Sequence, residues 1–203
     1  MDKINYIIKL ECNNRKSRKI EKKIKKSISK LGCYIFNLLK DIDICINICD
    51  ILYHTNIQST GCYFLNEHNG KVFANIYIDS KTKHNIKNTF YHEIGHLIDD
   101  IVGCLENKVS FTKENAKIYK FSQTNNDFIF FNKIENDFFT QIKRNDFDDF
   151  TFFDLRESFA NSFADMVIGK RNMSMVNIKH IIYQVVEKHS NKCKMGYNKM
   201  YLK

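Results

Sequence analysis

The sequence predicts an α+β fold: a small N-terminal mixed sheet with a covering helix, followed by a mainly helical part. Apolar residues recur at helical spacing over residues 14–40, they alternate along 71–79, and helical spacing prevails over 83–203. A chain of 203 residues is long enough for one well-buried domain. We therefore expect a single domain over 1–203, with the sheet in 1–82.

The first elements are a strand, a long helix and a second strand. Residues 5–12 predict a strand of mixed burial. Residues 14–40 predict one continuous helix, because their apolar side chains are three or four positions apart and share a face. Residues 43–51, rich in isoleucine, predict the second strand.

The next two segments predict a β-hairpin. Residues 62–65 and 71–79 flank a turn that ends in Asn69-Gly70, a pair suited to positive φ angles. Apolar and other residues alternate along 71–79, as expected for a strand with two different faces. We expect this second strand of the hairpin to lie at an edge of the sheet.

The remaining elements are helices. Asp154 is the expected N-cap of one of them, and Gly169 its C-terminal stop. The predicted segments are 84–102, 113–122, 131–143, 154–169 and 174–189.

The net charge of +9 is concentrated between Arg15 and Lys30. Such a run can contact nucleic acid, an anionic membrane or an acidic substrate. The apolar residues among the charges are helically spaced, which favours a solvated helix face. Nucleic acid is therefore not the expected partner.

Neither an export signal nor a membrane span is evident. Met1 to Leu10 is interrupted by charged and polar residues, and no run reaches the ~18 apolar residues of a span. The seven cysteines fit no C-x-x-C pair, so we expect reduced thiols in a cytoplasmic or other reducing compartment, or a protein delivered by a non-standard export route. A zinc site through Cys45 and Cys49 stays open, although the residues between them favour a strand.

The run His92-Glu93-Ile94-Gly95-His96 carries the chemistry of the chain. Positions i and i+4 share one helix face, so His92 and His96 can both bind one Zn²⁺ ion through imidazole nitrogens. Glu93 then lies beside the metal and can act as general base towards a water molecule. The apolar helical pattern around the motif supports this interpretation.

A catalytic zinc needs a third protein ligand, for which there are four candidates: Asp99, Asp100, Glu106 and Glu157. Asp99 lies about 4.5 Å along the axis from His96, so we prefer it as a hydrogen-bond acceptor for a ligand histidine. Glu157 is the preferred ligand. It opens a second helix, in which the small residues Ala160 and Ala164 permit close packing on the motif helix.

Two runs, YHEIGHLIDD at 91–100 and ESFANSF at 157–163, resemble a family of zinc metallopeptidases. The family comprises the catalytic domain of anthrax lethal factor and the clostridial Pro-Pro endopeptidases. The resemblance covers residues 15–190 and implies a zincin-like fold. It also implies His92, His96 and Glu157 as zinc ligands and Glu93 as the general base.

The resemblance further implies cleavage of an extended peptide that adds to an edge strand. We expect that strand to be residues 75–79, with Asn75 and Tyr77 as the substrate-binding residues.

The chain departs from the family pattern in three places. Phe150 stands where the family has a tyrosine that stabilises the oxyanion, which would cost about 10²–10³ in rate. Asn161 replaces the family's second glutamate in the ligand helix, where we expect it to contact the zinc ligands. Glu157 follows His96 by 61 residues, and the extra segment 104–150 is interpreted as a lid or substrate-reading insertion.

The leading hypothesis is a monomeric, zinc-dependent endopeptidase acting on a peptide or protein. The alternative is a catalytically silent, zinc-bearing binding module of the same fold. A third possibility is a binder of nucleic acid or an anionic surface through residues 15–30.

Overall fold

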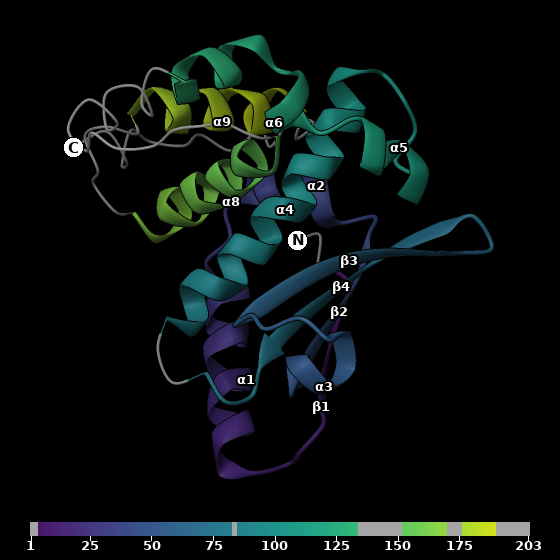
Figure 1. Cartoon of the computed structure of the whole chain (residues 1–203), viewed down its shortest axis with the longest axis vertical. Helices are drawn as coiled ribbons and strands as arrows, with labels where there is room; N and C mark the ends of the chain where they lie inside the picture. Colours follow the sequence, from purple (N-terminus) through teal and green to yellow (C-terminus); the bar gives the residue numbers. More distant parts are fainter. Residues whose placement is uncertain (1–3, 83–84, 134–151, 170–175, 190–203) are drawn as a thin grey trace.

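The computed structural model describes residues 4–82, 85–133, 152–169 and 176–189. These residues form a four-stranded mixed sheet and a set of helices, which confirms the α+β fold. The sheet and helix α1 (Arg15–Ile28) occupy one half of the molecule, and the later helices pack above them (Figure 1).

The sheet has the strand order β1-β2-β4-β3. Strands β1 (Tyr6–Leu10), β2 (Asp43–Cys49) and β4 (Lys71–Asp79) run parallel, and β3 (Gly61–His68) pairs antiparallel with β4. The prediction that residues 75–79 lie at an edge is wrong, because β4 is hydrogen-bonded on both sides. Alternation along a strand indicates its two faces but not its neighbours, and the edge beside β4 belongs to β3.

The hairpin between β3 and β4 has the predicted turn. Asn69 and Gly70 both adopt positive φ angles, of 52° and 71°, which match a tight hairpin turn. Strand β3 is longer than predicted, because the pairing with β4 continues from Gly61 to His68.

The single helix predicted over 14–40 is two helices, α1 and α2 (Cys33–Leu39). Helix α1 ends in a tightened turn, in which the Leu31 amide bonds to the Ile28 carbonyl at 3.0 Å. Gly32 then adopts an extended conformation and starts α2 in a new direction. Both helices bury their apolar faces. The apolar spacing therefore predicted the buried residues correctly, but it did not indicate that the helix is interrupted.

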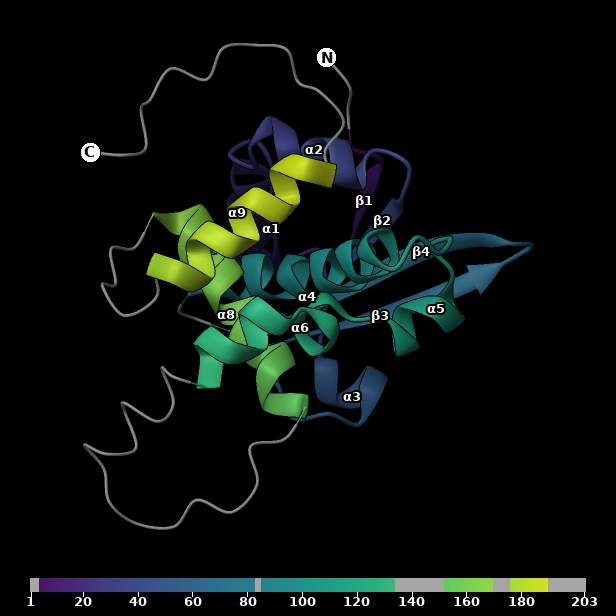
Figure 2. The same cartoon turned by 90° about the horizontal axis from the view of Figure 1, so that it is seen from above.

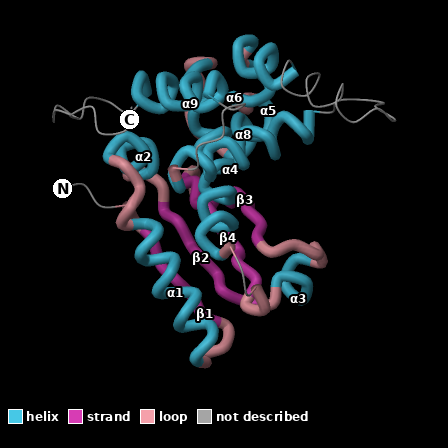
Figure 3. Tube along the Cα trace, turned by 90° about the vertical axis from the view of Figure 1, so that its left-hand side faces the viewer, coloured by secondary structure: helices cyan, strands magenta, loops and turns pink. Residues whose placement is uncertain are grey.

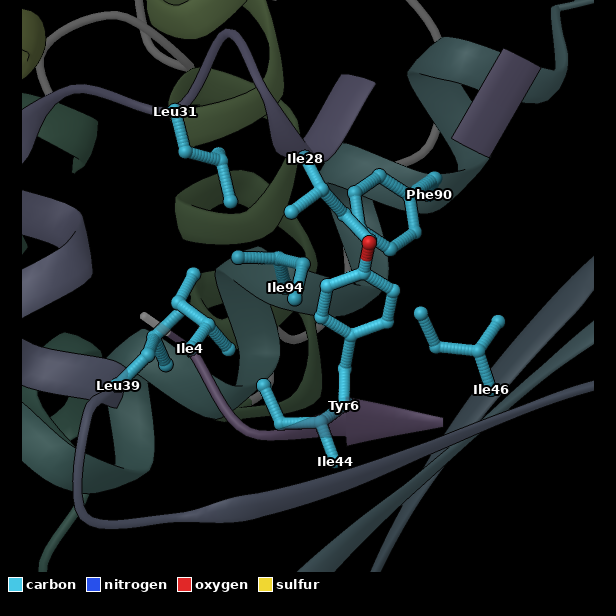
Figure 4. A pocket seen from close by; sticks show the side chains of 9 residues that line it. All are labelled: Ile4, Tyr6, Ile28, Leu31, Leu39, Ile44, Ile46, Phe90 and Ile94. Atoms are coloured by element: carbon cyan, nitrogen blue, oxygen red, sulfur yellow. The ribbon is translucent and has the colours of Figure 1, made fainter. Parts of the chain in front are cut away.

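The hydrophobic core lies between the sheet and helices α1 and α4 (Ile86–Glu106). Figure 4 shows side chains from these elements, from α2 and from the adjoining loops pointing toward one another around a small apolar pocket. They are Ile4, Tyr6, Ile28, Leu31, Leu39, Ile44, Ile46, Phe90 and Ile94. In the side view, α1 lies along the sheet and α4 beside it (Figure 3). The basic residues of α1 point away from this core and are exposed.

Strand β2 ends at Cys49 rather than at residue 51. Ile51 instead begins the short helix α3 (Ile51–Thr55), which the apolar pattern did not predict. The His54 amide bonds to the Asp50 carbonyl at 3.2 Å, so the chain turns into a helix directly after the strand.

Helix α4 is the central element, with the sheet on one side and helices α8 (Phe152–Ile168) and α9 (Val176–His189) on the other (Figure 2). Because α8 begins at Phe152, Asp154 lies in its first turn and is not the N-cap, although an acidic residue suits either place. Gly169 ends α8 with a φ angle of 76°, as predicted.

The segment after α4 contains short helices. The helix predicted over 113–122 is divided into α5 (Lys113–Ile118) and α6 (Phe121–Thr124), and residues 126–133 are also helical. The rest of the helix predicted over 131–143 lies outside the described residues, as do residues 134–150 of the interpreted lid, Phe150 included. No helix in the described part of the chain is long and apolar enough to cross a membrane.

Candidate metal centre

Helix α4 presents His92 and His96 one turn apart on the same face. Their Nε2 atoms lie only 3.1 Å from each other. Both side chains are largely buried, with 18% of His92 and 8% of His96 exposed. Two imidazole nitrogens that share one small space in this way are suited to bind one metal ion.

Glu157 comes from α8 and completes the group. One carboxylate oxygen lies 3.2 Å from His92 Nε2, and the other lies 3.3 Å from His96 Nε2. The three side chains are therefore near enough to hold one ion. The structure brings together the ligand set that the sequence predicted, although 61 residues separate His96 from Glu157.

Close packing of α4 on α8 brings Glu157 to the histidines. A Cβ on Gly95 would lie 2.9 Å from the Ala160 Cα and 3.1 Å from its carbonyl oxygen. Ala160 and Ala164 are both fully buried, as their small size in this helix predicted. Larger residues at this crossing would hold the two helices apart.

Glu93 is buried one residue along from His92, and only 5% of it is exposed. Burial raises the pKa of its carboxyl to about 7, against the lowering effect of His92. Strand β3 passes directly beside it, since a Cβ on Gly61 would lie 2.7 Å from Glu93 Oε1. A carboxyl group with a pKa near neutrality is suited to proton transfer.

The ligand side chains influence one another's protonation. Burial alone would lower the pKa of His92, but the hydrogen bond to Glu157 and the charges of Glu93 and Glu157 raise it. For His96, burial outweighs Glu157 and the pKa is lowered. Hydrogen bonds from both histidines hold the pKa of Glu157 far below its usual range. Glu157 is thus ionised at neutral pH, as a metal ligand must be.

Asn161 holds the outer nitrogen of one ligand. Its Oδ1 atom lies 3.0 Å from His92 Nδ1. Asn161 lies one turn after Glu157 on α8, so the same helix supplies a ligand and the partner of another ligand. A contact of this kind fixes the tautomer and orientation of the ring, and the predicted contact between Asn161 and a candidate ligand is present.

Asp99 does not accept a hydrogen bond from a ligand histidine, contrary to the prediction. Its two carboxylate oxygens accept from Ser122, one from the amide at 2.7 Å and one from the hydroxyl at 2.8 Å. His96 Nδ1 is buried without a partner among the described residues. Asp99 therefore links α4 to α6. Both of its carboxylate oxygens bond to Ser122, 23 residues later, and neither bonds to a histidine.

The other two candidate ligands are also engaged elsewhere. Asp100 accepts hydrogen bonds from Lys120 Nζ at 2.7 Å and Tyr63 Oη at 3.0 Å. Glu106 accepts from Lys188 Nζ at 2.7 Å and also contacts His189. Both carboxylates connect α4 to neighbouring elements and lie outside the ligand group.

Arg156 is a charged residue of the centre that the sequence analysis missed. Its contact with Asp100 is long, 3.8 Å from Nη2 to Oδ2, and its Nε is buried without a hydrogen-bond partner in the described structure. Its positive charge lowers the pKa values of both Glu93 and His96. The available signal was its position, directly before the predicted ligand Glu157.

Asn75 and Tyr77 lie on β4, inside the sheet. Asn75 is paired with Cys45 and Phe64, and Tyr77 with Asn47 and Cys62. Neither residue has a free backbone edge to offer a peptide, so the reason for predicting them as substrate-binding residues no longer holds. The strand that runs beside Glu93 is β3.

The donors present fit zinc. Two imidazoles and one carboxylate form one of the ligand sets of catalytic zinc sites, which keep a fourth position open. The unpartnered Nδ1 of His96 and the contact between His92 and Asn161 leave both Nε2 atoms directed at Glu157. No protein-family model matches the chain, and no curated protein matches it either.

Proposed function

We propose that the chain is a zinc-dependent endopeptidase. The observation that carries this proposal is the convergence of His92, His96 and Glu157 within 3.3 Å of one another, with Glu93 buried alongside. The resemblance of the two motif runs to the lethal-factor and Pro-Pro endopeptidase family supports peptide hydrolysis as the reaction. The fold proposed with it is zincin-like.

The proposed chemistry divides between the metal and Glu93. A zinc ion held by His92, His96 and Glu157 would supply a Lewis acid for the peptide carbonyl and would make water acidic enough to be activated near neutral pH. Glu93 takes a proton from the attacking water and passes it to the nitrogen of the leaving amine. The carbon–nitrogen bond breaks, and a carboxylic acid and an amine result.

The proposed substrate is an extended peptide that adds to β3. This strand is the last in the sheet, and no described strand pairs with its outer side. Its Gly61 end lies against Glu93, so a peptide hydrogen-bonded to β3 would bring a carbonyl close to the general base. Main-chain pairing of this kind binds many sequences, and side-chain pockets then add specificity.

The test combines metal analysis with cleavage of a peptide library. Wild type is expected to contain one zinc per candidate centre and to cleave library members. Glu93→Ala is expected to keep the zinc and lose cleavage. Exposed Glu114 offers a matched control, and Glu114→Ala should keep both properties. Protein without zinc, or cleavage that persists in Glu93→Ala, would overturn the proposal.

The alternative is a zinc-bearing binding module without catalytic activity. It is favoured by Phe150, which stands where the family has a tyrosine. The two proposals share the zinc ligands and differ in turnover. Zinc in wild type together with no cleavage of any peptide supports the binding module, and one cleavage event that requires Glu93 excludes it.

A further inference from the structure

A second group of side chains with metal-ligating atoms lies where β1 and β2 finish. Glu11 follows β1, Cys49 ends β2, and His54 lies on α3, which packs at this end of the sheet (Figure 1). One donor atom from each of the three residues lies within 4.8 Å of the other two. None of these residues takes part in the centre formed by α4 and α8.

The backbone fixes the three donors independently. The Glu11 amide bonds to the Ile48 carbonyl at 3.1 Å and so extends the parallel pairing of the strands. Glu11 Oε2 accepts from the Asp50 amide at 2.8 Å, while its Oε1 lies 3.1 Å from His54 Nε2. Cys49 is buried, with 4% exposed, directly before the turn into α3. The group therefore requires little rearrangement to bind an ion.

From this arrangement we infer that Glu11, Cys49 and His54 form a second site for a zinc-like divalent cation, one that stabilises the fold. A thiolate, an imidazole and a carboxylate are a donor mixture that favours zinc over magnesium or calcium. Glu11 and His54 are partly exposed, at 36% and 39% of their side chains, so the ion can enter from solvent. This inference is independent of the proposed peptidase activity.

The local charge favours a cation. The negative charges of Glu11, Asp79 and Asp50 act on the Cys49 side chain. These charges attract a metal ion, which displaces the thiol proton when it binds. Lys81 forms an ion pair with Asp50 at 2.6 Å, whereas the Glu11 carboxylate contacts His54.

The bound ion would connect three elements of the fold. It would join the ends of β1 and β2 to α3, and α3 leads through residues 56–60 into strand β3 beside Glu93. Metal binding should therefore raise the thermal stability of the sheet end of the protein, because only the folded chain presents all three donors.

The test uses cobalt as the probe, on the full chain without an affinity tag. Cobalt bound to a thiolate gives a near-ultraviolet charge-transfer band, which the sulfur-free group of His92, His96 and Glu157 cannot produce. Metal-free wild type and the variant His92→Ala/His96→Ala should both develop the band, and in the double variant it should saturate at one equivalent. A band in the double variant supports the second site even if the candidate catalytic centre binds no metal.

Variants of the three donors identify the ligands. Cys49→Ser should abolish the band, and Glu11→Gln and His54→Ala should weaken cobalt binding, since both positions are exposed and tolerate substitution. Cys12 is an exposed thiol next to Glu11, and Cys12→Ser should keep the band. The inference is overturned if folded wild type shows no thiolate band, if Cys12→Ser rather than Cys49→Ser removes it, or if Glu11→Gln and His54→Ala bind cobalt as wild type does.

Discussion

The Cα of Ala160 lies so near to Gly95 that a Cβ on the glycine would come within 2.9 Å of it. Gly95 lies between the two histidines of α4, and Ala160 lies three residues after Glu157 on α8. The contact between these two backbones therefore determines how far Glu157 reaches toward the histidines. A change in the distance between the two helices would therefore change the geometry of the candidate metal centre.

Gly95→Ala is expected to destabilise the protein and to weaken zinc binding. Within an isolated helix this change would stabilise by about 0.5–1 kcal/mol. Here the added methyl group meets helix backbone, which cannot move aside, and overpacking of this kind costs about 1–3 kcal/mol. Thermal unfolding and zinc titration check both effects. A higher melting temperature with unchanged zinc affinity would contradict the observed contact.

Asn161→Ala should lower the zinc affinity by about 10–100-fold, because His92 Nδ1 loses the partner that orients the ring. Asn161→Asp keeps an acceptor at the same position and should restore or increase the affinity. The measurement is competition with a zinc chelator of known affinity. Equal affinities for the alanine and aspartate variants would show that the contact at 3.0 Å does not orient the ligand.

Ser122→Ala should reduce the free energy of unfolding by about 1–3 kcal/mol, since a buried carboxylate loses a hydrogen bond, and should leave zinc affinity unchanged. Burial raises the pKa of Asp99 from 3.8 to about 7. The folded state thus holds this proton more tightly than the unfolded state, and stability falls as the pH rises from about 4 to 7.

The cost of Ser122→Ala should therefore be larger at pH 8 than at pH 5, because the lost hydroxyl favours the ionised carboxylate. Urea unfolding at the two pH values measures it. Asp99→Asn is the matched control, since it removes the titrating group and should flatten the pH dependence. A lower zinc affinity in Ser122→Ala would contradict the expectation that Asp99 and Ser122 have no effect on the histidine ligands.

Arg156→Gln should move the acidic limb of the cleavage pH profile to higher pH. The positive charge of Arg156 lowers the pKa of Glu93, and Glu93 must be ionised to accept a proton. Without that charge, a higher pH is needed to ionise it. Arg156→Lys retains the charge and should keep the limb near its wild-type position. A purely structural role for Arg156 predicts lower activity in both variants with no shift of the limb.

The sequence was informative wherever a short-range pattern determines the structure. The spacing of His92 and His96 predicted a shared helix face, and Asn69-Gly70 predicted the hairpin turn. The long-range pairing of Glu157 with the histidines was also predicted, because small residues follow it on α8 and zinc requires a third ligand. The first two features depend on helix and turn geometry, which neighbouring residues largely define, and the third follows from the number of ligands that zinc requires.

The errors concern choices among partners that are far apart in sequence. Asp99 could have bonded a histidine or another donor, and only tertiary packing brings Ser122 to it. Strand alternation could not tell whether β4 has one neighbour or two. Gly32 breaks the first helix although the apolar spacing continues through it. Arg156 belongs to no motif and is marked in the sequence only by its position before Glu157, since its effect on Glu93 arises when α8 meets α4.

The open side of β3 has a consequence for the behaviour of the protein at high concentration. A strand with unpaired amide and carbonyl groups can recruit the same strand of a second molecule and begin aggregation. Helix α5 contacts the far part of β3, where the Lys113 amide donates to Glu67 Oε2 at 3.0 Å. The helix shortens the accessible edge and so discourages growth of an intermolecular sheet, while the proposed pairing of a short peptide needs only the part of β3 beside Glu93.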